Sequence, residues 1–109
     1  MTETYSVEQP ARSDVDGWQG PTLLQFGTNW CGHCKAAQPL VAQTLAQHPG
    51  VRHVMVEDGS GRVLGRSFSV TLWPTLVFLR DGQVVGRLVR PVDGAPIINL
   101  LDQIDAAAG

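Results

Sequence analysis

The chain has 109 residues, of which 43% are hydrophobic and 17% charged, and its net charge is −2. This length and composition predict a single packed domain over residues 1–109 rather than a disordered chain. A nucleic-acid-binding domain of this size usually has an excess of basic residues, so we do not expect a nucleic-acid partner.

Neither a membrane span nor a secretory leader is expected from the sequence. The longest apolar run, Leu72–Leu79, is interrupted by Pro74 and Thr75 and is much shorter than the roughly 18 residues of a transmembrane helix. The segment Met1–Tyr5 has no basic start and no apolar stretch behind it. We therefore expect a cytoplasmic protein, although a trimmed mature chain would look the same.

The first half of the chain predicts a strand followed by a long helix. Residues 1–20 are the least regular, with a short edge strand at Tyr5–Val7 and a helical turn capped by Ser13. A buried strand is predicted over Thr22–Phe26. A helix follows from about Cys31 to Gln47, and Pro39 inside it is expected to bend the axis.

The second half predicts a strand, a helix, a hairpin and a last helix. Val51–Val56 reads as a strand with Val51, His53 and Met55 on one face and Val54 and Val56 on the other. The remaining elements are a short helix over Arg62–Phe68, strands over Thr75–Leu79 and Gln83–Val89 joined by an Asp-Gly turn, and a helix opened by Pro96. This order predicts an α/β fold in which a mixed sheet has helices on both faces.

Cys31 and Cys34 are the only cysteines. The loop between them is too small to stabilise a fold, so the pair is expected to serve chemistry or metal binding. A structural zinc site takes four ligands, and His48 and His53 are remote in sequence. We expect no metal within one chain, while a metal or cluster shared by two chains and two incidental buried cysteines remain as alternatives.

The position of the cysteines favours redox chemistry. Cys31 falls where a strand meets a helix N-terminus, and the unpaired N–H groups and the helix dipole there favour a thiolate. Cys34 lies one turn further in, so it is expected to be less exposed and to act as the resolving thiol. His33 can donate a hydrogen bond or place a positive charge beside the sulfur, which makes the couple more oxidising. Lys35, the only lysine, adds a further charge.

Several motifs together resemble the thioredoxin family: Phe26, the run from Trp30 to Lys35, Pro39, Trp73-Pro74-Thr75 and Asp81-Gly82. The resemblance implies a thioredoxin fold and an enzyme that exchanges disulfides with protein substrates, in which Cys31 attacks and Cys34 resolves. It implies no cofactor beyond this cysteine pair, and a reductase or glutathione as the electron donor. Pro74 is expected to be cis and to face the cysteines, beside an extended substrate segment. We expect a monomer.

The sequence departs from the family pattern at four places. Gly32-His33 separates the cysteines, as in protein disulfide isomerase domains, which predicts a more oxidising couple than the usual Gly-Pro. Gln25 stands where a buried acid is usual, so either water or another group takes the Cys34 proton, or Gln25 is a satisfied core residue. Trp73 either shapes the substrate groove or covers apolar surface. Arg90, at a position often occupied by glycine, either favours the thiolate or is a solvated rim charge.

The predicted catalytic residues are Cys31, Cys34 and His33, and the predicted substrate-binding residues are Trp30, Gly32, Trp73, Pro74 and Arg90. The direction of electron flow depends on the compartment. A couple near the isomerase value of about −180 mV stays reduced in a cytosol at roughly −240 mV and acts there as a reductase. The alternative is a binding or chaperone-like module with incidental redox activity. Seven arginines against one lysine hint at a GC-rich bacterial genome.

Overall fold

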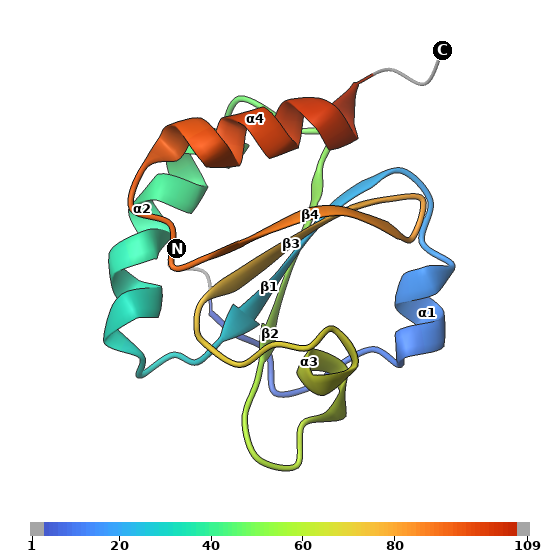
Figure 1. Cartoon of the computed structure of the whole chain (residues 1–109), viewed down its shortest axis with the longest axis vertical. Helices are drawn as coiled ribbons and strands as arrows, with labels where there is room; N and C mark the ends of the chain where they lie inside the picture. Colours follow the sequence, from blue (N-terminus) through green and yellow to red (C-terminus); the bar gives the residue numbers. More distant parts are fainter. Residues whose placement is uncertain (1–3, 107–109) are drawn as a thin grey trace.

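A mixed sheet forms the centre of the protein (Figure 1). The computed structural model describes residues 4–106. Within that range the sheet order is β2-β1-β3-β4, with β1 parallel to β2 and β3 antiparallel to both of its neighbours. The strands are β1 (Pro21–Gly27), β2 (Arg52–Glu57), β3 (Thr75–Arg80) and β4 (Gln83–Val89). The predicted mixed sheet is confirmed.

Helices cover both faces of this sheet, as predicted. Residues from α2 and α4 share one buried apolar cluster with the sheet, and residues from α1 and α3 share another on the opposite face (Figure 1). A parallel β1–β2 pair needs a crossover connection, and α2 supplies it. The helices are α1 (Arg12–Asp16), α2 (Gly32–Leu45), α3 (Val63–Ser67) and α4 (Gly94–Asp105).

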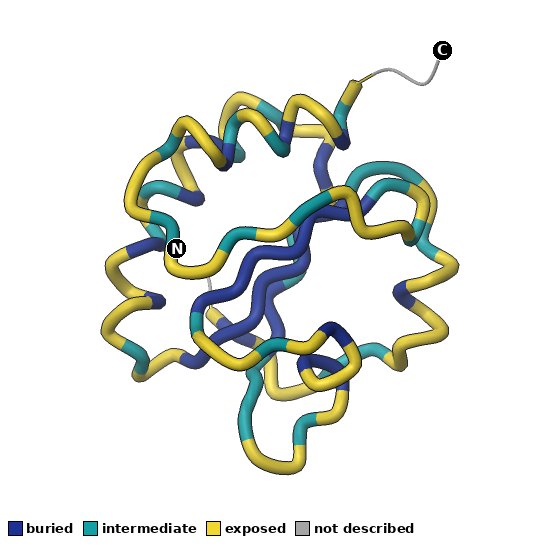
Figure 2. Tube along the Cα trace, in the orientation of Figure 1, coloured by how far each residue is buried: buried dark blue, intermediate teal, exposed yellow. Residues whose placement is uncertain are grey.

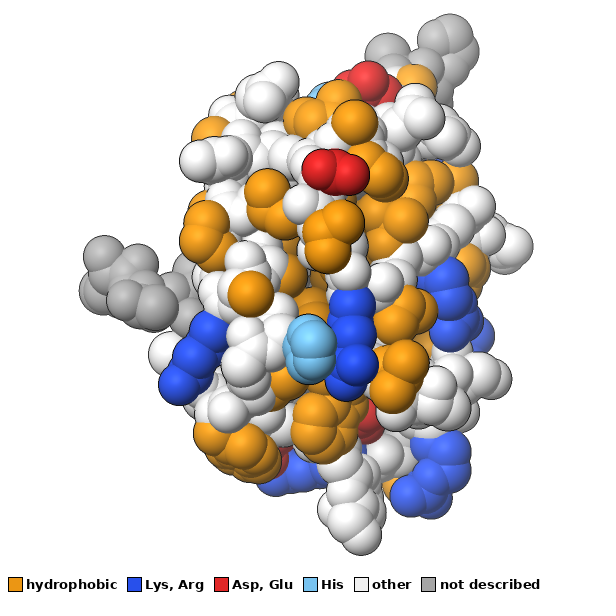
Figure 3. All heavy atoms as spheres, turned by 60° about the vertical axis from the view of Figure 1, so that its left-hand side comes forward, with side chains coloured by type: hydrophobic (Ala, Val, Ile, Leu, Met, Phe, Trp, Pro, Cys, Tyr) orange, Lys and Arg blue, Asp and Glu red, His pale blue; other side chains and the backbone are white. Residues whose placement is uncertain are grey.

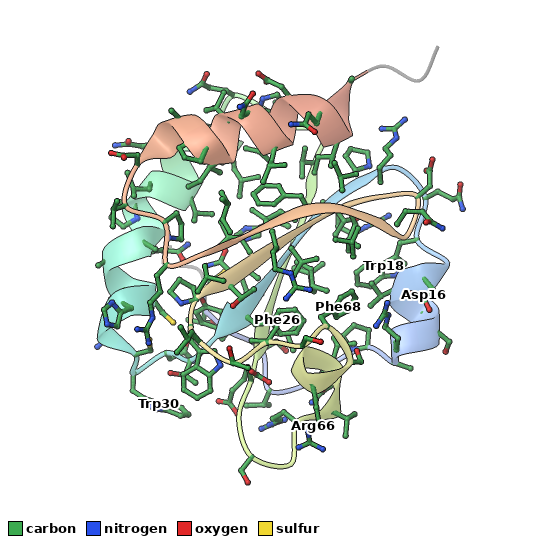
Figure 4. All side chains as sticks on the ribbon, in the orientation of Figure 1. Asp16, Trp18, Phe26, Trp30, Arg66 and Phe68 are labelled. Carbon is green, nitrogen blue, oxygen red and sulfur yellow. The ribbon has the colours of Figure 1, made fainter. Side chains whose placement is uncertain are left out.

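The two apolar clusters follow from the period-2 alternation of the strands. In β1, Leu24 and Phe26 pack toward α1 and α3, whereas Leu23 packs toward α2 and α4. All three are fully buried, and the central strands are dark in Figure 2 because both faces are covered. The ring of Phe26 lies 5.9 Å from that of Phe68, centroid to centroid, beside α3 (Figure 4). This packing fixes the C-terminal end of β1, from which the cysteine segment leaves.

The alternation predicted for β2 is confirmed. Val54 and Val56 pack with the α1–α3 cluster, whereas Val51 packs with the α2–α4 cluster. Met55 belongs to a third, smaller cluster beside the cysteines. His53 lies on the same side, where its ring contacts Gln25 of β1.

Two helices begin earlier than predicted. The N-cap of α1 is Ala11 and not Ser13, because the Asp14 carboxylate accepts the Ala11 N–H at 3.1 Å and starts the helix two residues sooner. Helix α4 begins at Gly94, so Pro96 lies inside its first turn rather than opening it. The first backbone N–H groups of a helix have no partner within it, so a proline there removes no hydrogen bond.

The other elements agree with the sequence except at their ends. The predicted edge strand at Tyr5–Val7 is reduced to a single parallel bridge between Ser6 and Val56. Helix α2 begins at Gly32, runs through Pro39 and ends at Leu45, two residues before the predicted end. In the hairpin between β3 and β4, Asp81 and Gly82 have φ values of 53° and 78°. These left-handed conformations match the predicted Asp-Gly turn.

No helix within residues 4–106 combines the length and the apolar character needed to cross a membrane.

Candidate functional site

The Cys31 side chain caps the N-terminus of α2. Its backbone is extended, with φ −80° and ψ 123°, and its Sγ accepts a hydrogen bond from the Cys34 N–H at 3.2 Å. A capping side chain satisfies one of the backbone donors that a helix leaves unpaired at its start. Both cysteines are free thiols in this structure. Cys31 is partly exposed and Cys34 is buried, so an incoming disulfide meets Cys31 first.

The surroundings move the pKa values of the two thiols in opposite directions. Burial raises the pKa of Cys31, but hydrogen bonds from the Cys34 side chain and from the Cys34 and His33 backbone outweigh it. The Arg90 charge adds to them, and the pKa of Cys31 lies below its ordinary value. Burial raises the pKa of Cys34 to about 11, with a further increase from its hydrogen bond to Cys31.

His33 and Arg90 line one hollow between α2 and the segment after β4. On this face of the molecule a histidine lies beside a basic side chain among hydrophobic side chains (Figure 3). His33 acts on the Cys31 pKa through its backbone. Arg90 acts on the same pKa through its charge, which supports the first of the two interpretations given for Arg90.

The predicted cis bond between Trp73 and Pro74 is present. Arg90 fixes the segment before β3: its backbone N–H donates to the Pro74 carbonyl at 2.9 Å, and its Nε donates to the Trp73 carbonyl at 2.8 Å. Arg90 itself has a φ of 51°, in the left-handed region that favours glycine.

Trp73 is held at both ends. Its Nε1 donates to the Asp58 carboxylate at 2.8 Å, and its ring packs against the small cluster of Tyr5, Cys34 and Met55. Trp30, by contrast, is 68% exposed and points away from the body of the protein (Figure 4). Gly32 is exposed and Pro74 is buried. The structure therefore gathers the predicted residues around Cys31, on α2 and on the segments that flank β3 and β4.

A buried polar network lies behind Cys34, and the sequence interpretation missed most of it. It consists of Tyr5, Gln25, Gln38 and His53. Gln25 is completely buried; its Nε2 donates to Tyr5 Oη at 2.8 Å, and its Oε1 lies 2.7 Å from His53 Nε2. Gln25 is therefore a buried amide with hydrogen-bond partners, and the structure leaves open which group takes the Cys34 proton. Tyr5 escaped notice because a weak edge strand gave no reason to place it beside a cysteine.

Gly27 at the end of β1 makes room for this contact. A Cβ added there would lie 2.6 Å from the Cys34 sulfur and 2.7 Å from the Tyr5 hydroxyl oxygen. Atoms that close would have to move, so only glycine lets the two groups meet over the strand. The predicted strand over Thr22–Phe26 stops short of Gly27, and nothing in the sequence indicated its contact with the cysteine.

Among the residues that the structure describes, no three His, Cys, Asp or Glu side chains are grouped as ligands for a metal ion.

Residues 6–103 match the family model described as Thioredoxin. The chain belongs to the thioredoxin family. It is 32% identical over 103 residues to a thioredoxin of Chlamydia trachomatis, covering 94% of this chain and 98% of that protein. Its fold superimposes on reduced thioredoxin 2 from Pseudomonas aeruginosa PAO1 with a TM-score of 0.87 and 52% identity, over 99% and 100% of the two chains.

A third relative is matched over a shorter stretch. Mitochondrial thioredoxin-3 of Saccharomyces cerevisiae is 31% identical over 67 residues, and the chain spans only 53% of its length. The activity follows from the family match and from the two relatives that are matched over nearly their whole length. The protein is a thiol–disulfide oxidoreductase with Cys31 and Cys34 as its CxxC pair. It reduces protein disulfides and draws electrons from a reductase.

The opposite pKa shifts predict that the two thiols are alkylated in sequence. Because the thiolate is the reactive form, iodoacetamide should modify Cys31 at least about tenfold faster than Cys34 at pH 7. The Cys31 rate should level off at a lower pH than the rate of an ordinary cysteine thiol, whereas the Cys34 rate should still be rising at pH 10. Peptide mass spectrometry over a time course at each pH measures both rates.

Protein unfolded in urea is the control, since both thiols should then react at similar rates. A folded protein whose two rates level off at the same pH would contradict the assignment of opposite shifts.

Proposed function

We propose that Cys31 is the nucleophile and Cys34 the resolving thiol of this protein-disulfide reductase. The observation that carries the proposal is the cap: Cys31 Sγ is accessible and accepts the Cys34 N–H, while Cys34 is buried directly behind it. The Cys31 thiolate attacks one sulfur of a substrate disulfide, and the other substrate sulfur leaves. Cys34 then attacks Cys31 Sγ and releases the second substrate sulfur, so that the substrate is reduced and the cysteine pair oxidised.

Replacing the resolving thiol should trap the intermediate. With Cys34→Ser, Cys31 still attacks but nothing releases the mixed disulfide, so many different proteins should be captured from a cell extract and released by dithiothreitol. Non-reducing gels followed by mass spectrometry identify them. Cys31→Ser is the matched control, and it should capture none because the buried Cys34 is poorly reactive.

A single stoichiometric partner that stays bound when both cysteines are replaced would contradict this proposal. It would favour the alternative of a binding or chaperone-like module.

We further propose that Trp30, Gly32, Trp73, Pro74 and Arg90 border the groove that receives the substrate, with His33 beside it. Exposed apolar side chains support this, because a reductase that accepts many proteins needs an unspecific apolar surface around its nucleophile. Trp30 is 68% exposed and Val92, in the hollow shared by His33 and Arg90, is 84% exposed. The rigidly held Trp73 forms the part of this surface that adjoins the cis-proline.

Trp73→Ile should change the selectivity of the enzyme more than its chemistry. The substitution removes the flat ring and its hydrogen bond to Asp58, so activity toward several unrelated protein disulfides should change by different factors, on the order of tenfold between extremes. Reduction of a small aromatic disulfide should change little. Rates that are unaltered for all substrates would mean that Trp73 only covers apolar surface.

We propose that Gly32-His33 between the cysteines raises the reduction potential of the pair above that of ordinary thioredoxins, as in protein disulfide isomerase domains. Such a couple rests reduced where electrons are supplied, so we place its action as a reductase in the cytoplasm, with glutathione as an alternative donor. Cell fractionation tests the compartment. The 52% identity to a Pseudomonas protein supports a bacterial source.

We propose that one thioredoxin-fold unit acts as a monomer. Light scattering of the reduced protein tests this, because a dimer would double the mass.

A further inference from the structure

The donor and the acceptor of each hydrogen bond that Gln25 makes in the buried polar network follow from the atoms that meet. The amide oxygen of Gln25 can only accept, so the His53 Nε2 that lies 2.7 Å away must carry a hydrogen. The NH2 group of the same amide lies toward Tyr5 and Gln38, at 2.8 Å from Tyr5 Oη and 3.4 Å from Gln38 Oε1. The Tyr5 oxygen thus accepts from Gln25, and its own hydrogen is left to point elsewhere.

The Tyr5 hydroxyl lies next to Cys34. Tyr5 Oη and Cys34 Sγ converge over Gly27, 2.7 and 2.6 Å from the space that a Cβ would fill. The side chains of Tyr5 and Cys34 are hydrogen-bonded, and this bond lowers the pKa of Cys34 against the larger effect of burial. Tyr5 keeps its proton, since burial raises its own pKa above the ordinary value. Tyr5 is therefore a donor to the sulfur and not a base.

A hollow gives the Cys34 proton a way out. Its volume is about 440 Å³, and it is lined by Tyr5, Thr28, Lys35 and Gln38 beside Cys34. Thr28 Oγ1 is buried at this wall and lacks a hydrogen-bond partner within residues 4–106. A buried hydroxyl without a protein partner is usually bonded to water, so the wall next to Cys34 is suited to hold one.

We propose that Tyr5, oriented by Gln25 and His53, donates a hydrogen bond that stabilises the Cys34 thiolate during the resolving step, while the Cys34 proton leaves to water in the adjoining hollow. The inference rests on the proposed role of Cys34 as the resolving thiol. Water then accepts the proton that the Gln25 amide cannot take, and Tyr5 stabilises the thiolate that remains. Gln25 and His53 are positioning residues, because they act on Cys34 only through Tyr5.

The step is balanced as follows. Cys34 S–H loses its proton to water, and the thiolate attacks Cys31 Sγ of the mixed disulfide. The bond between Cys31 and the substrate sulfur breaks as the Cys31–Cys34 bond forms. The electron pair leaves on the substrate sulfur, which takes a proton from solvent. The cysteine pair is oxidised by two electrons, the substrate is reduced by two, and Tyr5 returns unchanged.

Replacing Tyr5 by phenylalanine removes only the hydroxyl. Reduced protein is mixed with 5,5′-dithiobis(2-nitrobenzoate) in a stopped-flow instrument, where Cys31 releases one coloured thiolate and the resolving Cys34 releases a second. The second phase of Tyr5→Phe should be about threefold slower at pH 7, with the first phase unchanged. This follows if the pKa of Cys34 in the mixed disulfide rises by about one unit and its nucleophilicity rises with a Brønsted slope near 0.5.

The pH profile separates this role from a merely structural one. A thiolate that has lost a hydrogen bond is more nucleophilic, so the Tyr5→Phe profile should stay about threefold below the wild-type profile while Cys34 is mostly protonated and should cross it only above the wild-type Cys34 pKa of about 11. The other titratable groups that face Cys34 are Cys31 and Lys35 on α2 and, through Gln25, His53 on β2. They are the same in both proteins, so they do not produce the crossing.

Thr44→Val is the matched control. It removes a different buried hydroxyl, that of Thr44 on α2, which donates to the Leu40 and Val41 carbonyls, and it should leave both phases unchanged. Gln25→Leu is a second variant that keeps the Tyr5 hydroxyl without its orienting donor, and it should slow the second phase about twofold at pH 7. It gives a result even where Tyr5→Phe does not fold.

A second phase that is unchanged in both variants, or slowed by one factor at every pH, would overturn the role of Tyr5. If the wild-type protein releases only one coloured thiolate, the proposed function fails instead, because Cys34 then does not resolve.

Discussion

The hydrogen bond from the Cys34 N–H to Cys31 Sγ is the interaction on which the rest of the site depends. Cys31 Sγ caps α2 by accepting the backbone N–H of Cys34, so the reactive sulfur lies at the N-terminus of the helix. A sulfur in this place is stabilised as a thiolate by donors and by the helix dipole. The partner lies one turn inside, where the same helix buries it against β1. One local arrangement thus separates an accessible thiolate from a protected thiol.

The sheet keeps this arrangement in place. Phe26 and Leu24 anchor β1 on the face of α1 and α3, and Leu23 anchors it on the face of α2 and α4. The strand can therefore deliver Cys31 and present Gly27 to the sulfur of Cys34 without shifting. Residue 25 points into the site side of the sheet, and this chain fills the position with an amide whose three contacts are all within the buried polar network. A buried amide whose hydrogen bonds are all made avoids the desolvation penalty of a buried charge. It cannot take up a proton, so another group has to accept the proton of Cys34.

The element order and the Cys31–Cys34 chemistry could be predicted because both depend on short stretches of neighbouring residues. Apolar periodicity, an Asp-Gly turn and a cysteine pair at a strand–helix junction each need only a few neighbouring residues. The contacts of Tyr5 could not be predicted, since a single bridge at Ser6 places it beside β2 across more than forty residues of sequence. The packing of Gly27 against a sulfur was hidden for the same reason: it depends on tertiary distance and not on local pattern. The Asp14 cap of α1 was missed because Ser13 offered an equally plausible cap one residue away.

The equilibrium reduction potential of the Cys31/Cys34 pair tests most directly whether the capped thiolate and its buried partner form a working couple. The protein is equilibrated with glutathione buffers at pH 7, and the oxidised fraction is read from the mass shift after thiol alkylation. We expect one reversible two-electron transition, above the value of about −270 mV typical of thioredoxin and toward the roughly −180 mV of protein disulfide isomerase. A transition at the thioredoxin value would mean that the rest of the site cancels the effect of His33 on the reduction potential. The absence of any reversible transition would contradict the account as a whole.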